Sequence, residues 1–234
     1  MKPNQFPSGV NFNRLLKDDI LWLYNHRCGA HQVRYSEHPR CFLKEFAGKF
    51  TQPEKIGFLD IETTNLHATF GYVFCYSLKL LDGELIHHCC TPEEIKTYKF
   101  DKRIIQQFVK DAQGFDRLVV YWGKDRRFDL PFLRTRALHW KIPFPLYKEY
   151  RVTDVYDLVR NKCCLHRNRL ENIADVLKIP AKMHRMDPDR WNKGLAGHLP
   201  SLQWIQLHCD EDAITLEGVF KEMWVFGNLA KSSI

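Results

Sequence analysis

A short apolar run that contains two acids, KIGFLDIE at residues 55–62, places the strongest constraint on the fold. The run is typical of a buried β-strand, and because side chains alternate along a strand, Asp60 and Glu62 lie on one face. Two carboxylates beside a core repel each other unless a cation neutralises them. Oxygen ligands suit Mg²⁺ or Mn²⁺, so we predict a divalent-cation site here, with a salt-bridged strand edge as the alternative.

The segments after this strand alternate between strand and helix patterns. Two strands are expected at 70–81 and 84–90, because Asp82-Gly83 between them is a strong hairpin signal. The other expected elements are helices at 101–112, 127–140, 168–179 and 201–224 and strands at 116–123 and 151–158. Three consecutive strands followed by alternating helices and strands predict an α/β fold, a mixed sheet flanked by helices.

Composition excludes several classes of protein. Of the 234 residues, 44% are hydrophobic and 27% are charged, which is ordinary globular composition and excludes a mostly disordered chain or a coiled-coil rod. No apolar run in the sequence approaches the roughly 18 residues of a membrane span. The first residues, MKPNQFPSGVNF, lack the apolar core of a signal peptide, so we expect a cytoplasmic protein.

Positive charge is concentrated in one segment. Residues 121–170 contain 12 Lys and Arg against 5 Asp and Glu, an excess equal to the +7 net charge of the whole chain. Such one-sided charge is typical of a protein that binds a polyanion, and a solvated basic surface is the alternative. Tyr121, Trp122 and Phe128 in this segment would stack on bases or belong to the core, of which we favour the core.

Two further acids have the same kind of setting as the first pair. Asp129, in FDLPFL, follows a strand and begins a helix, where an acid is also a common first-turn residue. His208 and Asp212 are four apart on the last helix and therefore share a face. Asp212 lies beside the apolar stripe of that helix, whereas Asp210 and Glu211 are expected to be exposed to solvent.

These three stretches together resemble a known family. FLDIETTNL, then FDLPFL about 70 residues further on, then an acid on the final helix are similar to the three motifs of the DEDD exonucleases, which are 3′–5′ exonucleases of the ribonuclease H-like superfamily. RLENIADVLKIPAK at 169–182 also resembles the helical stretch before their last motif. The resemblance covers residues 55–226 and is to the short-chain members common in phage and bacterial genomes, so we expect a phage-encoded or bacterial protein.

The resemblance implies a site of four acids and two Mg²⁺ or Mn²⁺ ions that hydrolyses the phosphodiester at a 3′ end. Asp60 would bridge the ions, Glu62 and Asp212 would complete one of them, and Asp129 would hold the other. His208 would orient or deprotonate the attacking water. One branch of the family has a tyrosine four residues before its last aspartate, and the other has a histidine five residues before it. His208 lies four residues before Asp212, so it combines the spacing of the first branch with the chemistry of the second. The alternative is a histidine on the surface of the helix.

The resemblance also implies how the substrate binds. Thr63, Thr64 and Leu66 would contact the terminal nucleotide, with the leucine against its base, although by itself Leu66 would be interpreted as core. Arg126 and Arg127, from the basic segment, would contact phosphates. The partner is thus the 3′ end of DNA or RNA, and proofreading would require a polymerase, or another replication or repair protein, on a separate chain.

Paired cysteines and histidines mark a second metal site near the start. HRCGAHQVRYSEHPRC contains C-x2-H, six residues, then H-x2-C, which suits a tetrahedral Zn²⁺ held by Cys28, His31, His38 and Cys41. His26 is a spare ligand, and chance clustering is the alternative. We expect residues 1–53 to form an N-terminal arm, a helix at 14–24 and this zinc-binding module, and residues 54–234 to form the ribonuclease H-like exonuclease domain.

Two other functions are compatible with the same residues. One is a structure-selective endonuclease that uses the same acids, and the other is a nucleic-acid-binding accessory protein with weak catalysis. We predict the metal-dependent 3′–5′ exonuclease, because all four acids are present.

Overall fold

The computed structural model describes residues 17–38, 41–42, 54–124, 127–145, 151–180 and 182–227. It divides the chain into two compact units, Met1–Glu54 and Lys55–Ile234. Each unit has its own cluster of buried hydrophobic residues.

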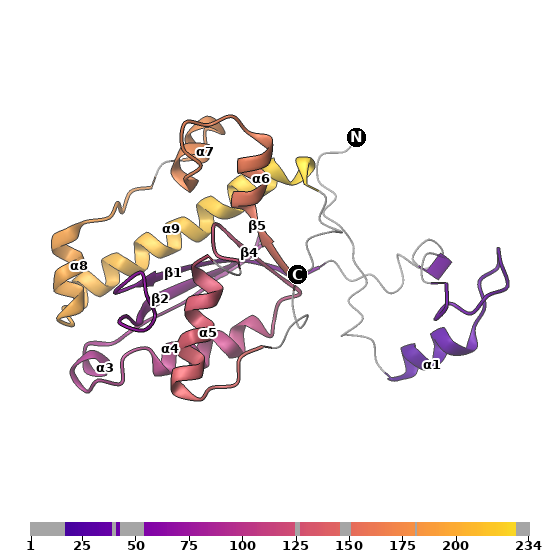
Figure 1. The fold of residues 1–234 in the computed structure, drawn as a ribbon, viewed down its shortest axis with the longest axis horizontal. Helices are drawn as coiled ribbons and strands as arrows, with labels where there is room; N and C mark the ends of the chain where they lie inside the picture. The colour runs from indigo at the N-terminus through magenta and orange to yellow at the C-terminus, as the bar shows by residue number, and fades with distance from the viewer. Residues whose placement is uncertain are drawn as a thin grey trace. The chain divides into compact units, whose positions relative to one another are not determined.

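The second unit is built on a five-stranded sheet with the order β3-β2-β1-β4-β5 (Figure 1). The strands are β1 (Ile56–Thr63), β2 (Val73–Leu80), β3 (Leu85–Cys89), β4 (Arg117–Val120) and β5 (Arg151–Asp154). β1 pairs antiparallel with β2, and β2 with β3, whereas β4 is parallel to β1 and β5 is parallel to β4. The predicted mixed sheet is therefore confirmed, and the Asp82-Gly83 turn joins β2 to β3 as expected.

Helices cover both faces of this sheet (Figure 1). In the described part of the unit they are α3 (Pro92–Lys96), α4 (Lys102–Ala112), α5 (Asp129–Trp140), α6 (Val155–Lys162), α7 (Leu170–Val176), α8 (Pro188–Leu195) and α9 (Leu199–Met223), followed by a short 3-10 helix (Trp224–Phe226). The long helix α9 packs along β1 and β2 and also contacts α6, α7 and α8, while α4 and α5 pack against each other.

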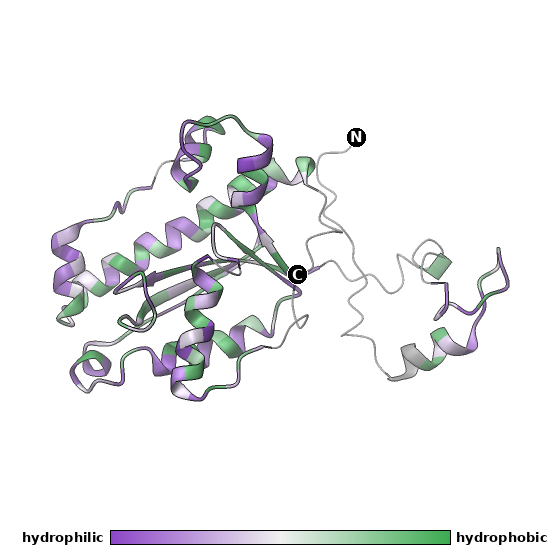
Figure 2. Cartoon of the chain, viewed as in Figure 1, coloured by the Kyte–Doolittle hydropathy of each residue, from purple (hydrophilic) through white to green (hydrophobic). Residues whose placement is uncertain are grey.

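The core lies between β1 and the helices. Figure 2 shows hydrophobic residues along the strands and a mixture of hydrophobic and hydrophilic residues along α9. Phe58 packs against Phe220 of α9 with the ring centroids 5.3 Å apart. Because side chains alternate along a strand, Asp60 and Glu62 follow Phe58 on the face that looks toward α9.

Among the differences from the sequence-based expectation, two concern segments that border the site. The strand expected at 151–158 ends at Asp154, whose side chain accepts a hydrogen bond from the Tyr156 amide at 3.1 Å and so caps α6. The stretch at 181–200, expected to be a polar linker, contains α8, which begins at Pro188 after the capping residue Asp187. In both places an aspartate cap begins a helix that hydrophobic periodicity alone does not reveal.

The described part of the first unit is small. It contains α1 (Lys17–Asn25) and an antiparallel bridge between Arg27 and Arg34; the helix expected at 14–24 thus corresponds to α1, and its first three positions lie outside the described residues. Its buried hydrophobic residues are Leu23, Cys28, Tyr35, Cys41 and Phe42. Throughout the residues described, we find no helix that combines the length and the apolar character of a membrane span.

Candidate active site

The site forms where β1 meets α9. Glu62 from the strand and His208 and Asp212 from the helix bring one ligand atom each to within 4.8 Å of one another. Nε2 of His208 lies 3.4 Å from a carboxylate oxygen of Glu62 and 3.7 Å from Oδ2 of Asp212. Between 11% and 13% of each of these side chains is exposed, so the group is nearly buried but reaches solvent.

Asp60 lies in the same cluster. Cys209 of α9 donates its thiol to the backbone carbonyl of Asp60 at 3.4 Å, which holds the strand against the helix at this point. Oδ2 of Asp60 is buried and has no hydrogen-bond partner among the described residues. A buried carboxylate oxygen without a donor is costly, so this atom is suited to a cation ligand.

Asp129 belongs to the same group of interacting acids. It is the first residue of α5, its side chain is buried, and the Leu130 amide bonds to the Gly123 carbonyl at 3.0 Å to close the turn before the helix. Burial, and then the negative charges of Asp60, Asp154 and Asp212, raise the pKa of Asp129 well above its usual range. Asp129 is thus close enough to Asp60 and Asp212 to be repelled by both.

The electrostatics of the cluster are those of acids crowded together. Burial and then the charge of Asp212 raise the pKa of Asp60, and burial and then the charges of Asp60 and Asp212 raise the pKa of Glu62, each well above its usual range. Lys182 offsets part of both shifts. Mutual repulsion, an orphaned oxygen and an oxygen-rich donor set all fit hard divalent cations, so these residues suit the predicted metal.

Two residues at this site were missed from the sequence. The Lys182 ammonium forms an ion pair with Oδ1 of Asp212. Asp154 accepts hydrogen bonds from the backbone amides of Trp122 at 2.9 Å and Lys124 at 3.1 Å, and so holds the loop that leads to Asp129. The sequence gives no sign of either contact, because the partners are far apart along the chain: Lys182 lies 30 residues before Asp212, and Asp154 lies 30 residues after Lys124.

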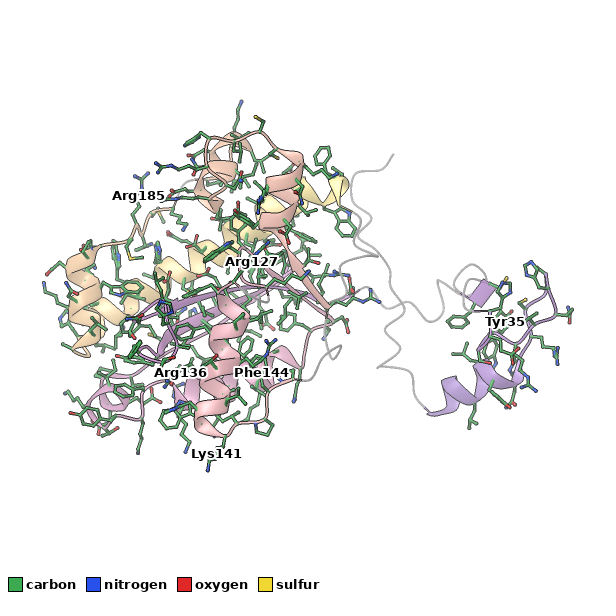
Figure 3. All side chains as sticks on the ribbon, viewed as in Figure 1. Tyr35, Arg127, Arg136, Lys141, Phe144 and Arg185 are labelled. Atoms are coloured by element: carbon green, nitrogen blue, oxygen red, sulfur yellow. The ribbon has the colours of Figure 1, made fainter. Side chains whose placement is uncertain are left out.

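The predicted phosphate-binding arginines have different outcomes. Arg126 lies outside the described residues. Arg127, labelled in Figure 3, pairs with both Asp154 and Asp157, and its guanidinium lies over the Tyr156 ring at 4.9 Å from the centroid. Arg136 of the same segment is buried against Asp101. Part of the positive excess of residues 121–170 is therefore neutralised inside the fold.

The predicted nucleotide-binding residues line a cavity beside Glu62. A cavity of about 430 Å³ is bordered by Thr63, Thr64 and Leu66 on one side and by Phe128 and Trp191 on the other. Leu66 is 77% exposed, so it is not a core residue. Trp191, on α8, was missed because its segment was expected to be a linker.

Tyr121 and Trp122, which the sequence analysis also considered for base stacking, differ in their burial. Tyr121 bonds to the Asn168 carbonyl at 2.9 Å and is half-buried against Tyr156. Trp122 is 49% exposed, so the favoured core assignment is wrong for it.

The expectation that Asp210 is a solvent-exposed acid is wrong. Asp210 is buried, and Ser77 at 2.6 Å, Gln206 at 2.8 Å and His87 at 2.9 Å surround its carboxylate. Glu211 is also engaged, because the backbone amide and ring of His184 bond to its carboxylate. Both acids hold α9 in place, since this helix packs on more than one side.

The four predicted zinc ligands come together in the first unit. Nδ1 of His31 lies 3.8 Å from Sγ of Cys28 and 3.3 Å from Sγ of Cys41, and Nδ1 of His38 lies 3.7 Å from Sγ of Cys28. With Zn–S and Zn–N lengths of about 2.3 and 2.0 Å, donors around a tetrahedral ion lie about 3.3–3.8 Å apart. The observed separations fall in this range, so the four side chains suit one Zn²⁺ ion.

Substitution of Gly123 is expected to disturb Asp129 directly. A Cβ at Gly123 would overlap Oδ2 of Asp129 and would lie 2.8 Å from Cβ of Val120, so the carboxylate must move. We expect Gly123→Ala to lower the activity of this site about 100-fold, the usual cost of displacing a reacting group by about 1 Å. Unfolding and turnover would be measured together; turnover equal to that of wild type would mean that the observed position of Asp129 is not needed.

The chain is similar to known proteins over most of its length. The model of the RNase H superfamily matches residues 57–224. A search of the curated proteins finds no match. Among solved structures, the family B DNA polymerase from the hyperthermophilic archaeon Pyrobaculum calidifontis matches with a TM-score of 0.56 and 20% identity, over 73% of this chain and 25% of that one. This chain therefore spans about a quarter of the length of the polymerase, and the likeness concerns the fold.

Proposed function

The chain belongs to the RNase H superfamily, and from this membership we propose that it is a metal-dependent nuclease that removes nucleotides from the 3′ end of DNA or RNA. One observation carries the proposal. Asp60 and Glu62 from β1, Asp129 from the start of α5 and Asp212 from α9 are close enough to perturb one another's ionisation. Acids so far apart in the sequence meet at one point of the fold, as a two-metal hydrolytic site requires.

The residues present would divide the work as follows. Asp60, with its free Oδ2, would be shared between two divalent ions, Glu62 and Asp212 would complete the first, and Asp129 would hold the second. When bound, two such ions stabilise the attacking and leaving oxygens of a phosphodiester displacement. Lys182 holds Oδ1 of Asp212 in a fixed direction.

The substrate would enter from the two cavities next to these acids. The cavity lined by Thr63, Thr64 and Leu66 has the apolar walls that a terminal base requires. A second cavity of about 550 Å³ lies beside His208 and carries the cations Lys182 and Arg185, together with the acids Glu171 and Asp175. Figure 3 labels Arg185 on the segment between α7 and α8. The guanidinium of Arg185 would contact a phosphate of the substrate backbone, and binding should then weaken with salt.

End-labelled substrates test the proposal. Single- and double-stranded DNA and RNA, labelled at the 5′ or the 3′ end, would be incubated with Mg²⁺ or Mn²⁺ and with neither. We expect the 5′-labelled strands to shorten stepwise and the 3′ label to be released as a mononucleotide. Cleavage of a closed circle would instead indicate an endonuclease, and binding without turnover would indicate an accessory protein.

Removal of the Leu66 side chain should weaken substrate binding without affecting the fold. Because Leu66 is 77% exposed, truncation costs no core packing. Covering it with a base is worth roughly 1.4 kcal/mol, so Leu66→Ala should raise KM about tenfold and leave kcat unchanged. Phe70, which is 83% exposed and does not border the cavity, provides the control: Phe70→Ala should leave KM unchanged. Equal effects of the two variants would contradict base packing at Leu66.

The first unit and the partners complete the proposal. We assign one Zn²⁺ to Cys28, His31, His38 and Cys41, with a structural role. A polymerase or another replication or repair protein on a separate chain remains the partner that proofreading would require, and a bacterial or phage-infected cytoplasm remains the expected location.

A further inference from the structure

The imidazole of His208 has a fixed orientation among the active-site carboxylates. Nδ1 of His208 forms a hydrogen bond with the backbone carbonyl of His184, and a carbonyl can only accept, so Nδ1 carries the proton. In the neutral ring, Nε2 then has a free lone pair. That lone pair faces Glu62 at 3.4 Å and Asp212 at 3.7 Å.

The donor spacing fits a single ion. Two ligand atoms that each lie about 2.1 Å from the same six-coordinate ion are separated by about 3.0 Å when adjacent and by about 4.2 Å when opposite. Both observed distances from Nε2 fall inside this range. A histidine and an acid four apart on a helix are also a recurrent pair of metal ligands, because they share a face.

The carbonyl of His184 accepts the hydrogen bond that a metal-binding histidine donates from its other ring nitrogen. Metal-binding histidines almost always donate their other ring N–H to a carbonyl or carboxylate, which fixes the ring and the tautomer. His184 is itself held by Glu211, through both its backbone amide at 2.9 Å and its ring at 2.7 Å. Asp60 interacts with Asp212 of this cluster, and its buried, unpaired Oδ2 is an independent sign that a cation belongs there.

We propose that His208, through Nε2, is a direct ligand of the divalent ion held by Glu62 and Asp212, and that this nitrogen makes the site prefer a first-row transition ion such as Mn²⁺ to Mg²⁺. The inference rests on the proposed function for the presence of the ion. Mg²⁺ favours oxygen ligands and water, whereas imidazole binds transition ions more strongly. A nitrogen engaged with a metal does not accept a proton from water, so this role replaces that of a base.

Electron spin-echo spectroscopy of bound Mn²⁺ tests the proposal without relying on turnover. The full chain, loaded with one equivalent of Zn²⁺ for the Cys/His group of the first unit and then with one equivalent of Mn²⁺, should show modulation from a directly bound ¹⁴N. Uniform ¹⁵N labelling of histidine should replace that modulation by a ¹⁵N coupling, which tests the wild-type protein without any substitution.

Two variants separate His208 from other histidines. His208→Asn should remove the nitrogen coupling and weaken Mn²⁺ binding at least about tenfold by calorimetry, with a smaller loss for Mg²⁺. His87→Asn is the matched control, because His87 also faces an acid of α9, Asp210, outside the cluster; it should keep both the coupling and the affinity.

Failure of this inference differs from failure of the proposed function. Bound Mn²⁺ without nitrogen coupling, coupling that persists in His208→Asn, or no Mn²⁺ binding would each overturn the ligand role of His208. Release of mononucleotides from labelled strands, measured on the same preparation, reports on the proposed function separately. Hydrolysis without nitrogen coupling would overturn only the inference and would leave His208 the role of base.

Discussion

Asp60→Asn should lower hydrolysis by about 10³-fold or more and, at the same time, make the protein without Mg²⁺ or Mn²⁺ more stable. Asp60 has an unpaired buried oxygen, and its charge raises the pKa of both Glu62 and Asp129. Charge stabilisation by a bound ion is worth several kcal/mol in a transition state, which at about 1.4 kcal/mol per factor of ten corresponds to the expected loss. An amide of the same shape removes the charge and keeps the packing.

The gain in stability of Asp60→Asn over wild type should increase as pH rises. The folded-state pKa values of Asp60, Glu62 and Asp129 are raised, so above the unfolded value of about 4 the folded state holds more protons than the unfolded state. The free energy of unfolding of wild type therefore falls as pH rises from about 4 through the folded pKa values. Asp60→Asn lacks one of these groups, so its advantage should be absent near pH 4 and grow toward pH 8.

Denaturant unfolding of zinc-loaded protein between pH 4 and 8 measures this difference. At neutral pH we expect the free energy of unfolding of Asp60→Asn to exceed that of wild type by about 1 kcal/mol or more, which corresponds to about 2–4 °C in Tm for a chain of this size. Added Mn²⁺ should reverse the order, because wild type binds it more tightly.

Asp210→Asn is the matched control for this experiment. Asp210 is a buried acid on α9 whose oxygens are bonded by Ser77, Gln206 and His87. Its replacement should lower stability at neutral pH rather than raise it. If both variants lose stability, crowding of charge at Asp60 is the wrong explanation.

The parts of this site that the sequence predicts are those set by local periodicity. Alternation along β1 places Asp60 and Glu62 together, and the four-residue spacing on α9 places His208 beside Asp212. Asp210 shows the limit of this reasoning. The apolar stripe of a helix predicts one buried face, but α9 packs on the sheet and on α6, α7 and α8, so positions outside the stripe are buried as well.

The residues that could not be predicted act through contacts between distant segments. Asp154 supports the loop before Asp129 from the end of the neighbouring strand β5, and Lys182 reaches Asp212 from an irregular stretch. Trp191 borders the cavity from a helix that Asp187 caps. No periodic pattern in the sequence predicts these contacts, because each contact joins segments that are far apart along the chain. The gathering of the four proposed zinc ligands was predictable for the opposite reason, since pairs of these residues three apart lie in one short segment.

Cys28→Ser should deprive the first unit of zinc and, with it, of its fold. The described core of this unit has only five buried hydrophobic residues, and two of them are the cysteines themselves. A core of that size does not hold a chain together without a metal or a disulfide, and domains of this kind are unfolded without zinc. Loss of one ligand should lower zinc affinity by more than about 100-fold, beyond the cost of losing a supporting hydrogen bond.

Zinc analysis and amide hydrogen exchange on the full chain measure the two effects. The amides of Cys28 and Tyr35, bonded to the carbonyls of Val33 and His26, should be protected with zinc and exchange freely in Cys28→Ser. Amides of β1 should keep their protection, because the second unit has its own core. His26→Asn is the control within the unit, since the ring of His26 bonds to the Trp22 carbonyl, outside the ligand group, and zinc should remain bound. Protection of Cys28 and Tyr35 that survives removal of zinc would show that the unit folds without it.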